Sequence, residues 1–387
     1  MILFMKMKVY ADHAATTKLC DVAYEAMLPY FRDSFCNPSG VYTEGVRAGS
    51  AVNEARHTIA ESLGAYDREV IFTAGGSEAD NMALVGAMEA EGTKGRHIIT
   101  TNIEHHAVLN TCKYLESRGF RVTYVKVREN GTVDPADIEK AICPDTALVS
   151  VMFANNEIGT IQPIEEIGKI CKEHGILFHT DAVQAYGKVK IDVDKLNIDM
   201  LSASAHKFGG PKGAGFLYVR RGTPMTSFVH GGSQEFSLRG GTENVPAIVG
   251  MGVAARVSTE SMEESARHER ELIKYLYSGV KEKIPDVLLN SDTEKGLAGI
   301  LNLTIPGVNG DSLLITLDMK GIAASTGSAC AMSLEEPSHV LKAIGRGEEG
   351  AKSSIRISLG HENTLEEMDY IISCLKESVE YLRSIRA

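Results

Sequence analysis

The sequence lacks the features that mark several classes of protein. It has no basic excess, because 40 Lys and Arg against 51 Asp and Glu give a net charge of −11. This disfavours direct binding of nucleic acid or of an anionic membrane surface. No apolar run approaches the roughly 18 residues that a membrane span needs, and the apolar start Ile2–Met5 is too short for a signal peptide. We therefore expect a protein of the cytoplasm without a membrane partner.

Metal-binding and nucleotide-binding patterns are also missing. The seven cysteines are odd in number, widely scattered and never in CxxC spacing, which argues against a disulfide framework and against a zinc ribbon. The glycine-rich turn at residues 75–78 lacks the G-x-G-x-x-G spacing of a dinucleotide-binding fold, and no G-x-x-x-x-G-K-[ST] motif occurs. We expect no intrinsic metal site, and a nicotinamide-dependent oxidoreductase is disfavoured.

What is present is an α/β pattern long enough for two or three domains at about 150 residues each. Short apolar runs alternate with helical patterns between residues 17 and 258, which predicts a mainly parallel seven-stranded sheet covered on both faces. The expected strands are Glu69–Thr73, His97–Thr101, Arg121–Val127, Ala147–Phe153, Ile176–Asp181, Met200–Ser202 and Gly215–Val219. Helices are expected to begin near Glu78, His106, Pro135 and Ile164.

The pattern changes after residue 258. An amphipathic helix is expected from Thr259 to about Ile284, followed by short strands and a final helix from Thr364 to about Ile385. Thr364 and Glu367 stand in capping-box spacing at its start. We predict a large domain of residues 17–258 and a smaller α+β domain formed by residues 1–16 and 259–387.

The first candidate site motif is Gly75-Gly76-Ser77-Glu78, which follows an expected strand and opens an expected helix. Glycines allow close approach of the backbone to a ligand, and the N-terminus of a helix favours a phosphate group. Taken alone, this motif is equally typical of an ordinary tight turn between a strand and a helix.

A second constellation follows two neighbouring expected strands. Asp181 and Gln184 come after one strand, and Ser204 and Lys207 come after the next. Ligands of open α/β sheets bind beyond the carboxyl ends of the strands. A carboxylate that keeps a ring nitrogen protonated and a lysine that forms a Schiff base suit a phosphorylated pyridine aldehyde, with Gln184 as a donor to its ring hydroxyl. Alone, Asp181 could be a helix cap and Lys207 a solvated lysine.

With these motifs the chain resembles the pyridoxal-phosphate enzymes of aminotransferase class V, and within them the cysteine desulfurases. The resemblance covers essentially the whole chain. It rests on motifs at residues 10–17, 155–159, 181–184, 204–207, 210–215, 239–244 and 325–330. It implies the type I fold of pyridoxal-phosphate aminotransferases, with pyridoxal 5′-phosphate as the cofactor.

The resemblance assigns roles to individual residues of the cofactor site. His105 would stack on the pyridine ring and move a proton, which suits a flat, titratable imidazole, whereas the adjacent His106 is treated as a bystander. Asn156 would contact both the ring oxygen and the substrate. Thr242 would reach the phosphate of the other subunit, which implies a homodimer. The expected phosphate ligands are Gly76, Ser77, Ser204 and His206.

The resemblance also assigns the substrate and sulfur chemistry. Cys330, set in a loop of small residues, would attack the sulfur of L-cysteine and keep it as a persulfide. It is also a candidate for a transient iron–sulfur ligand. Arg356 alternates with Ile355 and Ile357 on an expected strand and would bind the substrate carboxylate. Asn37 is a weaker candidate for substrate contact and could be part of a turn.

The expected activity is therefore conversion of L-cysteine to L-alanine, with the sulfur passed to an iron–sulfur scaffold or to another acceptor protein. A lyase acting on selenocysteine or cysteine sulfinate shares the fold and the cofactor and remains an alternative. A non-catalytic binding protein is the alternative from another class, and the retention of Lys207, Asp181, His105 and Cys330 argues against it. The sequence does not indicate which pathway receives the sulfur.

Overall fold

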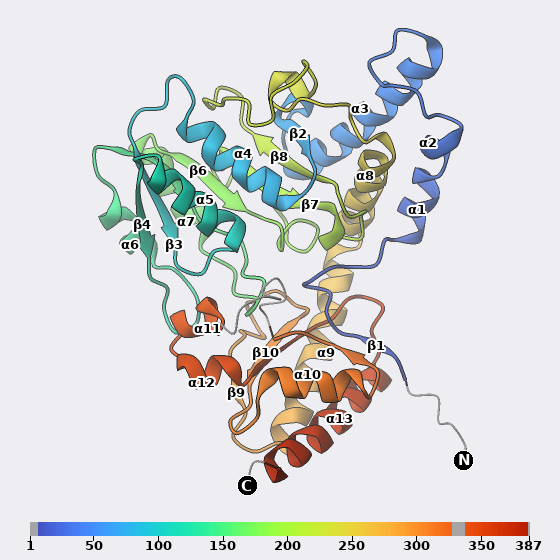
Figure 1. The fold of residues 1–387 in the computed structure, drawn as a ribbon, viewed down its shortest axis with the longest axis vertical. Helices are drawn as coiled ribbons and strands as arrows, with labels where there is room; N and C mark the ends of the chain where they lie inside the picture. Colours follow the sequence, from blue (N-terminus) through green and yellow to red (C-terminus); the bar gives the residue numbers. More distant parts are fainter. Residues whose placement is uncertain (1–6, 327–336, 386–387) are drawn as a thin grey trace.

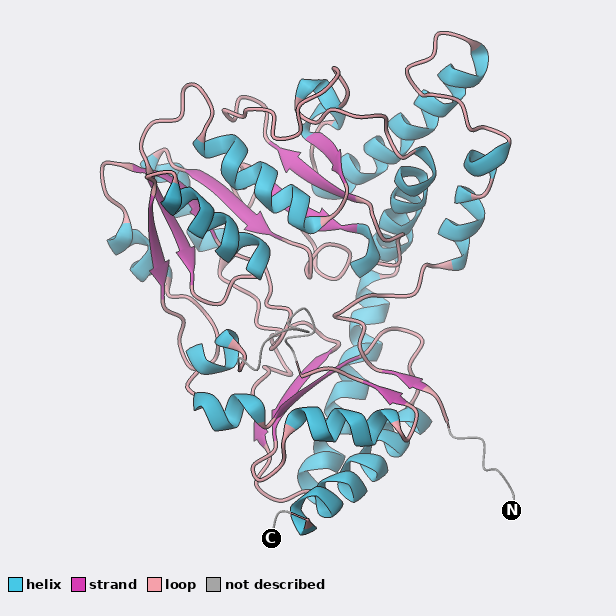
Figure 2. Ribbon diagram, in the orientation of Figure 1, coloured by secondary structure: helices cyan, strands magenta, loops and turns pink. Residues whose placement is uncertain are grey.

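The computed structural model describes residues 7–326 and 337–385. Its secondary structure forms two bodies, which Figure 1 shows one above the other. The upper body contains a large sheet with helices on both sides, and the lower body contains smaller sheets with helices around them (Figure 2). Helix α9 (Met262–Lys283) runs from the upper body into the lower one.

The large sheet has seven strands in the order β2-β8-β7-β6-β5-β3-β4. Strand β8 is antiparallel to β2 and β7, and all other pairs are parallel, so the mainly parallel seven-stranded sheet is confirmed. The strands are β2 (Val70–Thr73), β3 (His97–Thr101), β4 (Arg121–Val125), β5 (Thr146–Ser150), β6 (Leu177–Asp181), β7 (Met200–Ser204) and β8 (Gly215–Val219).

Alternate residues of these strands enter two different hydrophobic cores. On β3, Ile98 belongs to one core and Ile99 to the other, and the same holds for Leu148 and Val149 on β5. Successive side chains of a strand point to opposite faces, so both faces of the sheet are covered. The helices that cover them include α3 (Thr43–Leu63), α4 (Gly76–Met88), α5 (His106–Ser117), α7 (Ile164–His174) and α8 (Val245–Glu260).

The lower body is built on an antiparallel sheet in the order β12-β10-β9, formed by β9 (Leu288–Leu289), β10 (Ile300–Thr304) and β12 (Ser354–Ser358). Strand β1 (Val9–Tyr10) pairs in parallel with β11 (Ile322–Ala323). Val9 and Ala11 also share a hydrophobic core with residues between 272 and 382. The start of the chain therefore packs with its end, as a domain of residues 1–16 and 259–387 requires, although the exact boundaries stay a prediction.

One predicted helix start is confirmed by the structure, and another differs from it. Helix α13 (Leu365–Ser384) begins with the predicted capping box, in which Glu367 N donates to Thr364 Oγ1 and Thr364 N donates to Glu367 Oε2. The helix expected from Thr259 instead begins at Met262, because α8 continues to Glu260 and only Ser261 separates the two helices. The remaining α-helices are α1 (Asp21–Met27), α2 (Pro29–Arg32), α6 (Pro135–Ala141), α10 (Gly310–Asp318), α11 (His339–Ala343) and α12 (Gly347–Lys352).

Membrane-spanning segments were sought among these helices. Across residues 7–326 and 337–385, none combines the length and the apolar character that crossing a bilayer demands.

Candidate active site

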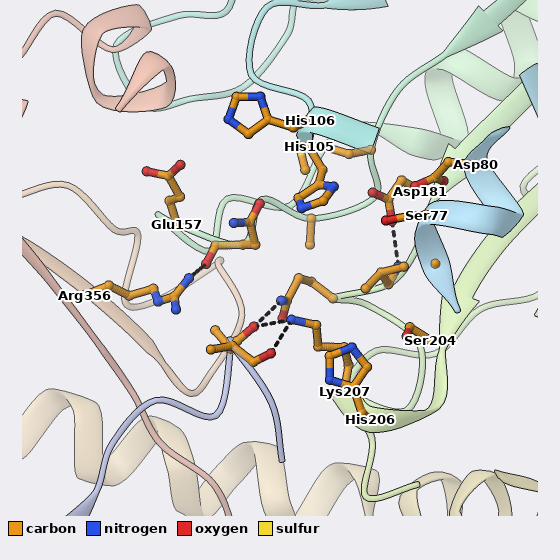
Figure 3. A pocket seen from close by; sticks show the side chains of 18 of the residues that line it. Ser77, Asp80, His105, His106, Glu157, Asp181, Ser204, His206, Lys207 and Arg356 are labelled. Atoms are coloured by element: carbon orange, nitrogen blue, oxygen red, sulfur yellow. Dashed lines mark hydrogen bonds between the residues drawn. The ribbon is translucent and has the colours of Figure 1, made fainter. Parts of the chain in front are cut away.

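A cavity of about 420 Å³ lies where the carboxyl ends of β6 and β7, the start of α4 and strand β12 of the lower body meet. In Figure 3, Arg356 and Glu157 lie on one side of this cavity and Asp181, Asp80 and Ser77 on the other. The predicted site residues that line it are Gly76, Ser77, His105, Asn156, Asp181, Gln184, Ser204, His206, Lys207 and Arg356. Segments from residue 14 to residue 356 therefore contribute to one site.

Lys207 lies in a single helical turn, Ala205–Lys207, that follows β7 directly. Its Nζ donates hydrogen bonds to the carbonyl oxygens of Ala14 at 2.6 Å and Ala15 at 2.8 Å. These backbone acceptors come from the N-terminal segment, and they hold the amine at the wall of the cavity (Figure 3). The lysine is thus an anchored group of the site, which answers the alternative that it is merely solvated.

Asp181 is the last residue of β6 and is only 5% exposed. Its Oδ1 accepts a hydrogen bond from Val183 N at 2.9 Å. Burial raises the pKa of Asp181 to about 6, although the Val183 N–H and the charge of Lys207 lower it. Because the ionised form of a buried carboxyl group is unfavourable, a cationic partner stabilises that form strongly. Asp181 is therefore suited to hold a protonated ring nitrogen.

Two further buried carboxyl groups lie behind Asp181. Burial and the nearby Asp181 raise the pKa of Asp80, on α4, well above its usual range. Burial raises the pKa of Glu104 to about 8, and its Oε1 accepts hydrogen bonds from Thr101 Oγ1 at 2.6 Å and Met152 N at 3.0 Å. Adjacent buried carboxylates resist joint ionisation, so this wall carries less negative charge than its three acids suggest.

The start of α4 forms a cradle beside these acids. Gly75, the N-cap residue, has φ +152° and faces Ser204. A Cβ on Gly76 would come within 2.6 Å of Val183 Cγ2, so the chain is close-packed at this point. A hollow that continues from the cavity around the helix start is lined by Ser77, Ser204, His206 and Lys212 among others. Free N–H groups, hydroxyls and a lysine form a donor set that favours a phosphate.

His105 serves as the N-cap of α5, and its Nδ1 accepts a hydrogen bond from Ala107 N at 3.1 Å. Burial, with the charge of Lys207, lowers the pKa of His105 to about 4. The ring is therefore neutral at pH 7, and because Nδ1 accepts, its proton is on Nε2. The resemblance implies a proton-transfer role for His105, which stays a prediction, and the structure shows that the same residue also caps α5.

Arg356 lies in the middle of β12, and only 2% of it is exposed. Ile355 and Ile357 point into the core of the lower body, so the predicted alternation of faces is confirmed. The guanidinium donates from Nη1 to Asn156 O at 2.8 Å and from Nη2 to Asp12 Oδ1 at 2.7 Å. These two bonds aim the group at the cavity and leave other N–H groups for a ligand.

Sequence reasoning missed several residues of the cavity wall. Glu157 belongs to the recognised 155–159 motif, and its Oε2 accepts a hydrogen bond from Ser338 Oγ at 2.5 Å. His106 also lines the cavity, with its ring 4.9 Å from that of His339. It is therefore closer to the chemistry than a bystander, although its sequence position beside His105 carried no separate signal.

Two of the predicted residues that the structure describes do not line this cavity. Within residues 7–326 and 337–385, the lining of the cavity includes neither Asn37 nor Thr242. Asn37 Oδ1 accepts from Ser39 N at 2.9 Å in a turn, and Thr242 is exposed on a loop. Their contacts with substrate and with a second subunit stay predictions. Cys330 lies outside the described residues. Among the described part of the chain, no group of three His, Cys, Asp or Glu side chains is arranged to hold a metal ion.

The sequence profile of the class-V aminotransferases matches residues 9–371. The "Cysteine desulfurase IscS" of Dictyoglomus turgidum is 48% identical over 381 residues, covering 98% of this chain and 97% of that protein. The "Cysteine desulfurase IscS" of Methanosarcina thermophila is 51% identical over 377 residues, covering 97% and 93%. The chain belongs to the cysteine desulfurases of aminotransferase class V.

Two solved structures share the fold of this chain. A "NIFS-LIKE PROTEIN" is 39% identical with a TM-score of 0.91, covering 97% of this chain and all of that one. "SspA in complex with cysteine" is 42% identical with a TM-score of 0.80, covering 92% and 99%. The expected type I fold of class-V aminotransferases is therefore confirmed.

Proposed function

We propose that this chain converts L-cysteine to L-alanine and keeps the sulfur as a persulfide on Cys330, with pyridoxal 5′-phosphate as its cofactor. One observation carries the proposal: a single cavity is lined by a buried carboxylate, Asp181, an anchored lysine, Lys207, a neutral imidazole, His105, and a buried guanidinium, Arg356. Relatives about half identical over nearly their whole length carry the same activity in their names.

The residues present fit the proposed cofactor. The donor-rich cradle at the start of α4 suits its phosphate, Asp181 suits its ring nitrogen and Lys207 would hold its aldehyde. Gln184 and Asn156 would contact the ring oxygen, with His105 against the ring. When bound, the protonated pyridine ring supplies a sink for the electrons released at the substrate carbon.

The other side of the cavity suits the substrate. Arg356 presents a planar guanidinium, which grips a carboxylate with two parallel hydrogen bonds. That contact would place Cα between Lys207 and His105, so that the freed amine of Lys207 can remove the Cα proton and either group can return one. Burial and the charge of Lys207 lower the pKa of His105 and keep its ring neutral, with Nδ1 accepting from Ala107 N and the proton on Nε2.

Sulfur transfer requires a nucleophile that reaches this cavity, and Cys330 is the candidate. Its thiolate would form a bond to the sulfur of the substrate as the C–S bond breaks. The bonding electron pair stays with the substrate carbon, which takes up a proton to become the methyl group of alanine. The persulfide would then pass to an iron–sulfur scaffold or to another acceptor, in the cytoplasm, from a homodimer in which Thr242 reaches the partner's cofactor.

Alanine formation from L-cysteine with a reductant tests this function. Wild type should bind pyridoxal phosphate and release alanine and sulfide in equal amounts. Lys207→Ala should be inactive, and Cys330→Ala should keep the colour of the cofactor while losing sulfide release. Full activity of Cys330→Ala would overturn the persulfide step and favour a lyase acting on selenocysteine or cysteine sulfinate.

A further inference from the structure

A second cavity, of about 350 Å³, lies behind the active site. Its walls come from the N-terminal segment, the turn after Gln184, the α8–α9 junction and the segment after β12, and they include Lys188 and Glu269. Lys207 lines both cavities, whereas Gln184 lines only the first and Lys188 only the second. The wall between the two cavities thus contains Lys207, the proposed cofactor lysine, and Gln184, with Lys188 on the side of the second cavity.

A chain of hydrogen bonds crosses this wall. Lys188 Nζ donates to Gln184 Oε1 at 3.2 Å, and Gln184 Nε2 donates to the Ala14 carbonyl at 2.8 Å. The same carbonyl accepts from Lys207 Nζ at 2.6 Å. Gln184 is only 3% exposed, so these partners, rather than water, determine how its carboxamide is oriented.

The two partners of Gln184 permit only one orientation of its carboxamide. A lysine amine has only donors to offer and a backbone carbonyl has only acceptors. If the amide were turned by half a rotation, its NH₂ would face Lys188 and its oxygen would face Ala14 O. Both hydrogen bonds would be lost. The NH₂ donor would then face the donor amine of Lys188, and the amide oxygen would face the acceptor oxygen of Ala14, which is costly for buried polar atoms.

Lys188 has an acidic neighbour in the lining of the second cavity. Burial lowers the pKa of Lys188 and the charge of Arg356 adds to this, while the carboxylate of Glu269, on α9, limits the fall. Burial raises the pKa of Glu269 itself to about 7, against the charges of Lys188 and Arg270. The negative charge of Glu269 therefore favours the protonated form of Lys188. A protonated amine cannot accept a hydrogen bond, so it keeps the amide in this orientation.

We propose that Lys188 is a positioning residue of the active site, which from the second cavity fixes the Gln184 carboxamide with its NH₂ toward Ala14 and the cofactor cavity. One N–H of Gln184 is used by Ala14 O, and the other is left for an acceptor in the first cavity, such as the ring oxygen of a pyridoxal. This inference rests on the proposed function, because it deepens the account of how that cofactor is held.

The test begins with the affinity of the apoprotein for pyridoxal phosphate and the visible absorption of the complex. Lys188→Met keeps the length of the side chain without a donor, and we expect binding weaker by roughly 3- to 10-fold, the effect of one hydrogen bond, with an altered absorption band. Lys188→Arg keeps a cationic donor and should recover most of the loss. Lys190→Met, an exposed lysine of the same loop, is the matched control and should bind as wild type does.

A double-mutant cycle separates positioning from a general structural role. In a Gln184→Leu background, Lys188→Met should weaken binding by less than about 2-fold, because the group on which it acts is gone. An equal loss in both backgrounds would overturn the proposal. The same cycle on the thermal unfolding of the apoprotein needs no cofactor: Lys188→Met should lower Tm in the wild-type background only. If wild type fails to bind pyridoxal phosphate, the proposed function fails, while this unfolding cycle still decides the role of Lys188.

Discussion

Replacing Arg356 by lysine tests the substrate side of the site. The guanidinium has five N–H donors, of which the structure places one on Asn156 O and one on Asp12 Oδ1. The remaining donors, held in a plane by those contacts, are those that would grip the carboxylate of L-cysteine. Lysine keeps the positive charge beside Asp12 but has no planar fork, so at least one bond to the substrate should be lost.

The magnitude follows from the type of bond. A hydrogen bond to a charged group contributes roughly 1.5 to 3 kcal/mol, so losing one should lower kcat/KM for L-cysteine by about 10- to 150-fold. Most of the loss should appear as a higher KM, because the carboxylate contact is made in the ground state and in the transition state alike. The assay is alanine formation at varied L-cysteine concentration.

A matched change elsewhere separates this effect from destabilisation. Arg270 on α9 also donates to two backbone carbonyls, Thr293 O at 2.8 Å and Gly296 O at 3.0 Å, and it does not line the cavity. Arg270→Lys should leave KM within about twofold of wild type. If Arg356→Lys had the same kcat/KM as wild type, or lowered kcat at constant KM, the assignment of the carboxylate to Arg356 would be wrong.

Three further predictions concern the stability of the apoprotein. Burial raises the pKa of Glu104 from 4.5 to about 8, so the free energy of unfolding of wild type falls as pH rises from about 5 to about 8 and levels off above that. In urea unfolding, Glu104→Gln should therefore gain stability relative to wild type by about 2 to 3 kcal/mol between pH 6 and pH 9, and a constant difference would contradict this. Glu235 accepts from Arg56 Nη1 at 2.7 Å and Nη2 at 2.8 Å in a buried pair; Glu235→Gln leaves that cation unpaired and should cost about 3 to 5 kcal/mol, measured by denaturant midpoint. Thr364→Ala removes the cap of α13 and should cost about 1 kcal/mol, whereas no change would show that the capping box adds nothing.

The large sheet was predictable because its strands have a simple physical signature. Runs such as residues 97–101 and 215–219 are rich in β-branched, aromatic and aliphatic residues and are buried along their whole length, and their bounds are confirmed by β3 and β8. The ends were less predictable where apolar residues continue beyond the ladder. The expected strand Ala147–Phe153 ends at Ser150, where pairing with β3 stops and Met152 N donates to the Glu104 carboxylate, although Val151 N and Phe153 N still donate to carbonyl groups of β6.

Some active-site residues could likewise be predicted from the sequence, and others could not. Asp181 and Lys207 follow neighbouring strands, so their meeting at the sheet edge could be anticipated from the sequence, and so could the face on which Arg356 lies. The carbonyl of Ala14 could not be anticipated, because a backbone group has no sequence signal. Lys188 was also missed, since its role depends on a cavity formed by segments far apart in the chain.

The central claim is that Cys330 keeps the substrate sulfur as a persulfide. The most direct test is mass spectrometry of the peptide that contains Cys330, after the enzyme has been incubated with L-cysteine in the absence of a reductant. Wild type should carry one additional sulfur on Cys330, and Lys207→Ala, which cannot start the reaction, should carry none. Alanine production by wild type with no additional sulfur on Cys330 at any time would contradict the account, because the sulfur would then leave the substrate by another route.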